Sequence, residues 1–206
     1  MLFRSKSVNF YYKLFIGFIP AAILGFILGD QIDALLENVT VVAIALIAGG
    51  VLLLFVDRLF GADITGDVSS TDKIGYKNAF IIGIFQCIAM VPGVSRSAAT
   101  IVGGLTQKLT RRTAAEFSFF LAVPTMFAAT GYQLYKFYSE GGGFSSDEYV
   151  PLIIGNLVAF IIAIFAMRSF VNFLTKRGFR IFGYYRIIVG ATILILLALG
   201  VDLQIV

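Results

Sequence analysis

The sequence predicts an all-α polytopic membrane protein with five transmembrane helices and one re-entrant helix–turn–helix hairpin. Of its 206 residues, 59% are hydrophobic and only 14% are charged, and the mean hydropathy is +0.92. A soluble domain is typically about 45–50% apolar and about 25% charged. A water-soluble particle of this size could not bury so much apolar surface. We therefore expect residues 1–206 to form a single integral membrane domain.

Five nearly uncharged runs are predicted to cross the membrane. A run of about 17–25 such residues is long enough to span the hydrocarbon core as a helix. The basic N-terminus and the apolar run after it resemble a signal peptide, but no small-residue cleavage site follows, so we expect a retained helix. The five runs are Leu14–Gly29, Val39–Val56, Phe117–Tyr135, Tyr149–Met167 and Gly183–Val201.

A sixth apolar region, residues 78–109, is interrupted by a turn that contains a charge. The interruption reads Val-Pro-Gly-Val-Ser-Arg-Ser from Val91 to Ser97, and proline followed by glycine is a turn signal. The arms, residues 78–91 and 95–109, would each reach roughly 21–22 Å, which is short of a hydrocarbon core of about 30 Å. We predict a re-entrant hairpin over residues 78–109, with its tip near the middle of the bilayer.

The basic residues support this topology. If the N-terminus is cytoplasmic and both ends of the hairpin lie on that side, 14 of the 16 basic residues are cytoplasmic, as the positive-inside rule requires. Lys136 lies outside and Arg96 lies in the membrane. Topology thus explains the pI of about 9.2, and no nucleic-acid partner is expected. The predicted cytoplasmic residues are Arg4, Lys6, Lys13, Arg58, Lys73, Lys77, Lys108, Arg111, Arg112, Arg168, Lys176, Arg177, Arg180 and Arg186.

The residue inventory excludes several kinds of site. The chain has no histidine, which rules out histidine-based catalytic triads and histidine-ligated metals. Its one cysteine, Cys87, cannot form a disulfide within the chain. All twelve acidic residues lie in or beside predicted loops, so none is expected near the centre of a span.

Arg96 is therefore the most informative residue. A cationic side chain at mid-membrane costs about 2.5–3.5 kcal/mol on insertion scales, and intramembrane charges usually mark function. One interpretation is a buried arginine bonded to backbone carbonyls or to an acid. The other is a guanidinium that binds an anion.

The neighbours of Arg96 favour the anion. Ser95 suits the N-cap of the second arm, and the amides of Ser97, Ala98 and Ala99 would then face the turn at the positive end of the helix dipole. Ser97 and Thr100 are expected on one face of that helix. A guanidinium, hydroxyls and a helix N-terminus together predict a phosphate site.

The candidate catalytic residues are Arg96, Ser95 and Ser97, and the candidate substrate-binding residues are Gln86, Gly93 and Thr100. Gln86 lies among apolar residues of the first arm, where its amide could either contact a ligand or join two helices. Either Ser95 or Ser97 could be the nucleophile or a hydrogen-bond donor. None of these residues is a candidate metal ligand.

A phosphate held at mid-bilayer indicates a lipid substrate, and the hairpin resembles a known family at this point. Its sequence is similar to that of the bacitracin-resistance family of undecaprenyl-diphosphate phosphatases. The resemblance extends over essentially the whole chain, as the C-terminal three-quarters of the family. The matching residues are Ala79–Ile101, with Pro92-Gly93-x-Ser95-Arg96-Ser97 and Thr100-Ile101 as the most specific part, then Glu116-Phe117-Ser118-Phe119 and Pro124.

The resemblance implies hydrolysis of a C55 lipid diphosphate to its monophosphate, which recycles the carrier for peptidoglycan synthesis and confers bacitracin resistance. It implies a divalent cation, Mg²⁺ or Ca²⁺, and a site open to the outer face of the bacterial inner (plasma) membrane. The expected partners are the polyprenyl diphosphate lipid and membrane lipids, and a homodimer is a candidate assembly.

One part of the family pattern has no match. Family members carry an N-terminal hairpin with Glu-x-x-x-Glu and Pro-x-Ser-Ser-x-Gly-His, and their inverted repeats build one site from two halves. Here Glu37, Glu116, Glu140 and Glu148 are never four residues apart. We therefore expect one half of that architecture, as a late start codon would produce. The carboxylate ligands of the cation would be missing, and we expect the chain alone to bind the diphosphate weakly and to show little or no diphosphatase activity.

Two alternatives stay open at this point. Broken helices near mid-membrane also occur in transporters, so a polyprenyl-phosphate transporter or flippase is the second interpretation. The third is an inactive member or fragment. The close match of the hairpin motif favours the phosphatase.

Overall fold

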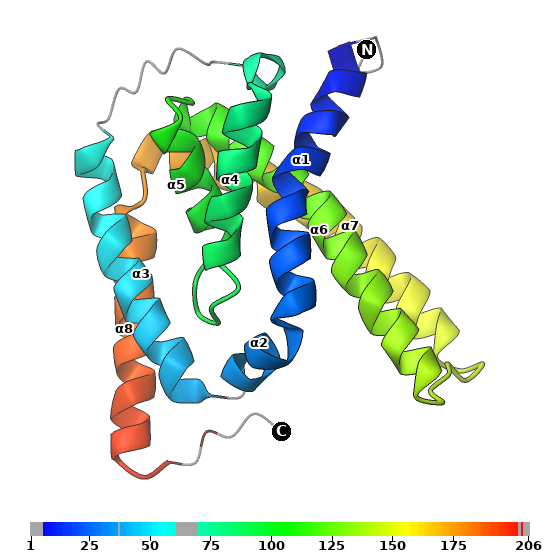
Figure 1. The fold of residues 1–206 in the computed structure, drawn as a ribbon. Helices are drawn as coiled ribbons and strands as arrows, with labels where there is room; N and C mark the ends of the chain where they lie inside the picture. The colour runs from blue at the N-terminus through cyan, green and yellow to red at the C-terminus, as the bar shows by residue number, and fades with distance from the viewer. Residues whose placement is uncertain (1–5, 37, 61–69, 202, 204–206) are drawn as a thin grey trace.

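The computed structural model describes residues 6–36, 38–60, 70–201 and 203, and within these residues it is helical and contains no strand. Eight α-helices and one short 3-10 helix, η1, account for the described elements (Figure 1). They are α1 Lys6–Ile27, α2 Gly29–Leu36, α3 Val39–Leu59, η1 Thr71–Lys73, α4 Tyr76–Ile88, α5 Arg96–Thr106, α6 Arg111–Ser139, α7 Tyr149–Arg177 and α8 Arg180–Ala198.

Five of these helices, α1, α3, α6, α7 and α8, are long and apolar enough to cross a membrane. They coincide with the five predicted spans, which confirms an all-α, multi-pass membrane protein. In α7, no residue of the most apolar 18-residue window is buried within the chain. That apolar surface faces outward, as a lipid-exposed helix requires.

The long helices alternate in direction, and α4 and α5 form a helical hairpin between them (Figure 1). α1, α6 and α8 begin at one end of the bundle, and α3 and α7 finish there. We call it the basic end, because it carries Arg58, Arg111, Arg112, Arg177 and Arg180. The hairpin enters from it and returns to it, as predicted. Three points stay predictions. They are that the hairpin re-enters a bilayer, that the basic end is cytoplasmic, and that the chain is half of an inverted repeat.

Glycines let α3 and α8 pack in close contact. A Cβ at Gly50 would lie 2.8 Å from the Gly183 carbonyl oxygen, and one at Gly183 would lie 2.8 Å from the Gly50 carbonyl oxygen. Two turns further along, a Cβ at Gly190 would lie 2.8 Å from the Ala43 carbonyl oxygen. Small residues allow this approach between membrane helices. α3 and α8 thus form a rigid pair beside the hairpin.

The hairpin is anchored in the apolar core near the basic end. Ile101 and Leu105 of α5 and Phe117 of α6 are buried there. A Cβ at Gly103 would lie 2.7 Å from the Phe85 ring, and one at Gly104 would lie 2.8 Å from the Ala114 Cβ. The two glycines therefore let α5 fit between α4 and α6.

Candidate functional site

The site is built around the turn between α4 and α5. The two helices hold 13 and 11 residues, or roughly 20 and 17 Å at about 1.5 Å per residue. Both are shorter than the predicted arms. α4 ends at Ile88, where the Ala89 amide bonds the Gln86 carbonyl, and α5 ends at Thr106. The seven residues from Ala89 to Ser95 form the turn.

Gly93 is required at the tip for two reasons. Its φ of +87° lies in the left-handed region that residues with a side chain rarely adopt. A Cβ there would collide with the Val42 carbonyl oxygen and lie 3.0 Å from the Ala45 Cβ. The tip therefore packs against the first third of α3. This steric need is independent of any ligand, and the role of Gly93 in substrate binding stays a prediction.

Ser95 caps α5, as predicted. Its Oγ accepts the Ala98 amide at 3.3 Å and lies 3.2 Å from the Ser97 Oγ. The Ala99 amide donates to the Ser95 carbonyl at 2.9 Å. The expectation that Ala98 and Ala99 keep free amides was wrong, because the cap and the first helical bond use both. Within the described residues, the Arg96 and Ser97 amides have no hydrogen-bond partner.

Arg96 is the first residue of α5, and its guanidinium has a donor without a hydrogen-bond partner. Its Nη1 is buried and has no hydrogen-bond partner in the described part of the chain. No described Asp or Glu forms an ion pair with it. The residue as a whole is half-buried. A half-buried guanidinium with a free donor beside a helix N-terminus is suited to an anion.

Thr100 does not share an open face with Ser97. It is fully buried, and its hydroxyl donates to the Arg96 carbonyl at 2.9 Å and lies 2.5 Å from the Ser118 Oγ of α6. Its partners are therefore the preceding turn and α6. Ser97 and Thr100 lie one turn apart on α5, as predicted, and the Thr100 hydroxyl also lies 3.2 Å from the Ser97 carbonyl. Its contact with Ser118 turns it toward α6, and a role of Thr100 in substrate binding stays a prediction.

Gln86 joins two helices. It is 2% exposed, and its Nε2 donates to the Thr125 Oγ1 of α6 at 3.2 Å. Its Oε1 is buried and has no partner among the described residues. The structure thus shows the helix-joining role, and contact with a ligand stays a prediction.

Ser95 and Ser97 line a cavity of about 180 Å³ between α5 and the helices α3, α7 and α8. Its walls are mostly apolar and include Phe170 and Phe182. Arg186 of α8 is the charged residue that the described lining contains. The structure therefore brings an arginine close to the two serines that sequence analysis had not connected with them.

Arg186 was predicted to lie with the cytoplasmic basic residues, and this was wrong. It is only 9% exposed, and its Nη2 donates to the carbonyls of Gly93 and Ala45, the latter at 3.4 Å. Its Nε is buried without a partner in the described residues. The available signal was an arginine inside the last apolar run, where a charge is costly.

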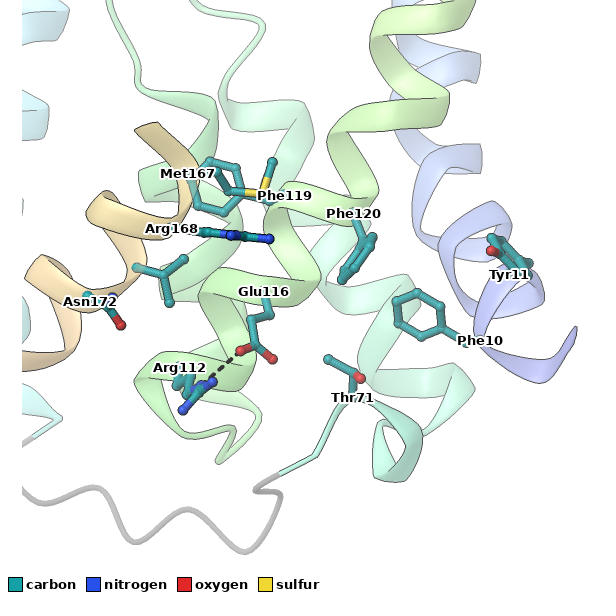
Figure 2. A pocket seen from close by; sticks show the side chains of 11 residues that line it. Phe10, Tyr11, Thr71, Arg112, Glu116, Phe119, Phe120, Met167, Arg168 and Asn172 are labelled. Atoms are coloured by element: carbon teal, nitrogen blue, oxygen red, sulfur yellow. Dashed lines mark hydrogen bonds and ion pairs between the residues drawn. The ribbon is translucent and has the colours of Figure 1, made fainter. Parts of the chain in front are cut away.

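A larger cavity of about 680 Å³ lies at the basic end between α1, α6 and α7 and contains none of the six candidate residues. Figure 2 shows that Glu116 in this cavity is directed to Arg112, 2.9 Å away. Arg168 of α7 and Phe119 of α6 line the same cavity. The carboxylate of Glu116 is therefore engaged away from the hairpin turn.

Comparison with known proteins decides the family. The model of the family described as "Bacitracin resistance protein BacA" matches residues 2–192. The chain belongs to the BacA family. Proteins named undecaprenyl-diphosphatase are similar to it. That of Flavobacterium johnsoniae is 54% identical over 191 residues, which cover 93% of this chain and 71% of the relative.

Two further relatives have the same name. The undecaprenyl-diphosphatase of Porphyromonas gingivalis strain ATCC 33277 is 50% identical, over 96% of this chain and 69% of the relative. That of Bdellovibrio bacteriovorus is 50% identical, over 96% of this chain and 74% of the relative. The matched region includes the hairpin with its Ser-Arg-Ser sequence.

The divalent cation implied by the BacA resemblance does not fit the described residues by themselves. They contain no group of three or more His, Cys, Asp or Glu side chains that could hold a metal ion. Hard cations need oxygen ligands, usually one or two carboxylates together with substrate phosphates. Asp57 and Glu116, on the helices around the hairpin, are paired with arginines. We assign no catalytic step to a cation.

Proposed function

We propose that this BacA-family protein is an undecaprenyl-diphosphate phosphatase that hydrolyses the C55 lipid diphosphate to the monophosphate in the bacterial inner membrane. The oxygen of water bonds to the terminal phosphorus, the P–O bond of the anhydride breaks, and inorganic phosphate and a proton are released. The product is the carrier lipid of peptidoglycan synthesis. Relatives with this name match at about half identity over most of the chain.

The observation that carries the proposal is the half-buried guanidinium of Arg96 at the N-terminus of α5, whose buried Nη1 has no hydrogen-bond partner among the described residues. Phosphoryl transfer needs little covalent chemistry from the protein and much neutralisation of charge on the phosphate oxygens. A planar guanidinium can contact two of these oxygens at once. In this proposal Arg96 binds the diphosphate, and the amides of Arg96 and Ser97 contribute further donors.

We assign different roles to the two serines. The Ser95 Oγ already accepts the Ala98 amide, so Ser95 maintains the start of the helix. Ser97 lines the same cavity and caps no amide among the described residues, so its hydroxyl is the better candidate to contact phosphate. The apolar surface of the long helices suits a polyprenyl chain in the surrounding lipid. A homodimer stays a prediction.

The test is release of inorganic phosphate from undecaprenyl diphosphate in nanodiscs by the purified protein joined to the N-terminal hairpin that the BacA family pattern carries. Arg96→Lys keeps the charge but cannot copy the bidentate contact, so we expect at least about a tenfold fall in kcat/KM, or roughly 1.4 kcal/mol. Arg177→Lys is the matched control, because Arg177 is exposed at the end of α7. Equal rates for wild type and Arg96→Lys would reject Arg96 as the phosphate ligand.

The transporter alternative predicts a different result when the protein is placed in lipid vesicles. If the protein moves undecaprenyl phosphate across a vesicle membrane and releases no phosphate from the diphosphate, the flippase interpretation replaces the phosphatase. The short hairpin of α4 and α5 is the feature that the two interpretations share.

A further inference from the structure

We infer that Arg186 is a positioning residue that fixes the turn of the hairpin by holding the carbonyl of Gly93. The two residues are 93 positions apart, and Arg186 lies on α8, outside the hairpin. The effect expected on catalysis rests on the proposed function. The effect expected on the turn itself does not.

Both polar groups of the peptide unit between Gly93 and Val94, its carbonyl and its amide, are hydrogen-bonded. Its carbonyl accepts from the Arg186 Nη2, and its amide donates to the Val91 carbonyl at 3.0 Å. Because a peptide group is planar, these two bonds fix the orientation of the whole unit. Ser95 and the N-terminus of α5 follow directly along the chain.

A glycine in the turn makes such a restraint necessary. Gly93 must be glycine because of its positive φ and its contact with Val42, yet glycine also has the widest choice of backbone conformations. Without an external contact, the Gly93–Val94 peptide could rotate. Arg186 supplies the contact from α8, which packs tightly against α3 through Gly50 and Gly183.

The direction of the carbonyl has an electrostatic consequence. A carbonyl oxygen carries partial negative charge and would repel a phosphate if it turned toward Ser97 and the N-terminus of α5. Arg186 holds the Gly93 carbonyl toward α8 and offsets its charge. The positive end of α5 then faces the site without an opposing dipole.

The sequence provides room for this guanidinium. A Cβ at Gly49 of α3 would lie 2.7 Å from the Arg186 Nη2, so only glycine leaves the space that the arginine occupies. Gly49→Ala should displace the guanidinium while the charge remains in place. This variant separates the position of Arg186 from its presence.

The structural test is hydrogen–deuterium exchange of the full chain in nanodiscs, read on peptides covering residues 91–98. We expect Arg186→Met and Gly49→Ala each to raise exchange there at least about tenfold, with α3 and α8 unchanged. Arg180→Met, an exposed arginine on the same helix, is the matched control and should change nothing. This test needs no enzymatic activity, so it remains decisive if the proposed function fails.

Two results would overturn the inference. Unchanged exchange at residues 91–98 in both variants would show that Arg186 does not restrain the turn. Faster exchange throughout α3 and α8 in Arg186→Met would place its role in packing those helices instead.

The kinetic test asks whether the restraint matters for chemistry. With undecaprenyl diphosphate, Arg186→Met should lower kcat at least about tenfold with KM changed less than about threefold, because the lipid still binds but the turn is not fixed. Arg186→Lys, which can reach one carbonyl, should recover part of kcat. A loss that appears only as less folded protein, with normal kcat per folded molecule, would contradict a positioning role.

Discussion

The carboxylate of Asp57 lies 2.8 Å from the guanidinium of Arg111, and both side chains are only 12% exposed. The second oxygen of Asp57 accepts the Phe179 amide at 2.8 Å and the Arg180 amide at 3.2 Å. Asp57 therefore joins the end of α3 to the start of α6 and also caps the start of α8. One carboxylate connects three of the long helices at the basic end.

Asp57→Asn should destabilise the protein strongly. The variant keeps an oxygen that can accept the Phe179 amide but removes the charge that balances Arg111. Breaking a largely buried ion pair costs about 3 kcal/mol. The measurement is unfolding in mixed SDS micelles, followed by circular dichroism.

The control for Asp57→Asn is Glu116→Gln. The Arg112–Glu116 pair is exposed, with 71% and 37% of the side chains accessible, so its loss should cost no more than about 0.5 kcal/mol. Similar losses for the two variants would mean that burial of the Asp57 pair does not matter.

Gly93→Ala should lower the free energy of unfolding by more than the strain of its positive φ alone. A side chain at a positive φ costs about 1–2 kcal/mol, and the new methyl group would also collide with the Val42 carbonyl. Gly141→Ala is a matched control, since its φ is +84° and nothing lies within 4 Å. The difference in unfolding free energy between the variants measures the contact of the tip with α3. No difference would show that the tip is not packed there.

Thr100 and Ser118 should be energetically coupled. Thr100→Val keeps the volume but removes the hydroxyl that contacts Ser118 at 2.5 Å, and Ser118→Ala removes the other partner. A double-mutant cycle should give a coupling energy of about 1 kcal/mol in unfolding. Thr192→Val, an exposed residue of α8, should show no coupling with Ser118→Ala. Additive effects of Thr100→Val and Ser118→Ala would contradict the contact.

The orientation in the membrane can be tested by cysteine labelling in intact cells. In a Cys87→Ser background, a cysteine at Ser146, between α6 and α7, should react with an impermeant maleimide. A cysteine at Ser70, at the basic end, should not react. A permeant maleimide should label both, which controls for accessibility. The opposite pattern would reverse the predicted topology.

The sequence predicted the parts of the fold that depend on local composition. Five apolar runs, a Pro-Gly turn and a serine at the start of a helix indicate spans, a hairpin and the Ser95 cap from neighbouring residues alone. The short helix α2 was not predicted, because the charged residues Asp30 and Asp33 after Gly29 read as a connecting loop.

The parts that were missed depend on contacts between distant helices. The contact of Arg186 with Gly93 follows from how α8 packs against α3, and the contact of Thr100 with Ser118 follows from how α5 packs against α6. A single sequence predicts which residues share one face of a helix, but it does not predict which other helix packs against that face. Arg186 was therefore assigned to the cytoplasmic basic residues because it lies near a predicted loop. Thr100 was assigned to substrate binding because it lies near Ser97.

The close contact of Gly50 with Gly183 has a mechanical consequence. Helices whose backbones touch can neither slide past one another nor rotate without separating, so α3 and α8 should move as one body. The tip of the hairpin rests on that body through Gly93. The start of α6 is tied to that body through Arg111 and to the hairpin through Ser118. The end of α6 and the start of α7 extend away from it in Figure 1 and are largely exposed. Bending within the bundle is thus expected in this outer part of α6 and α7, against a fixed frame.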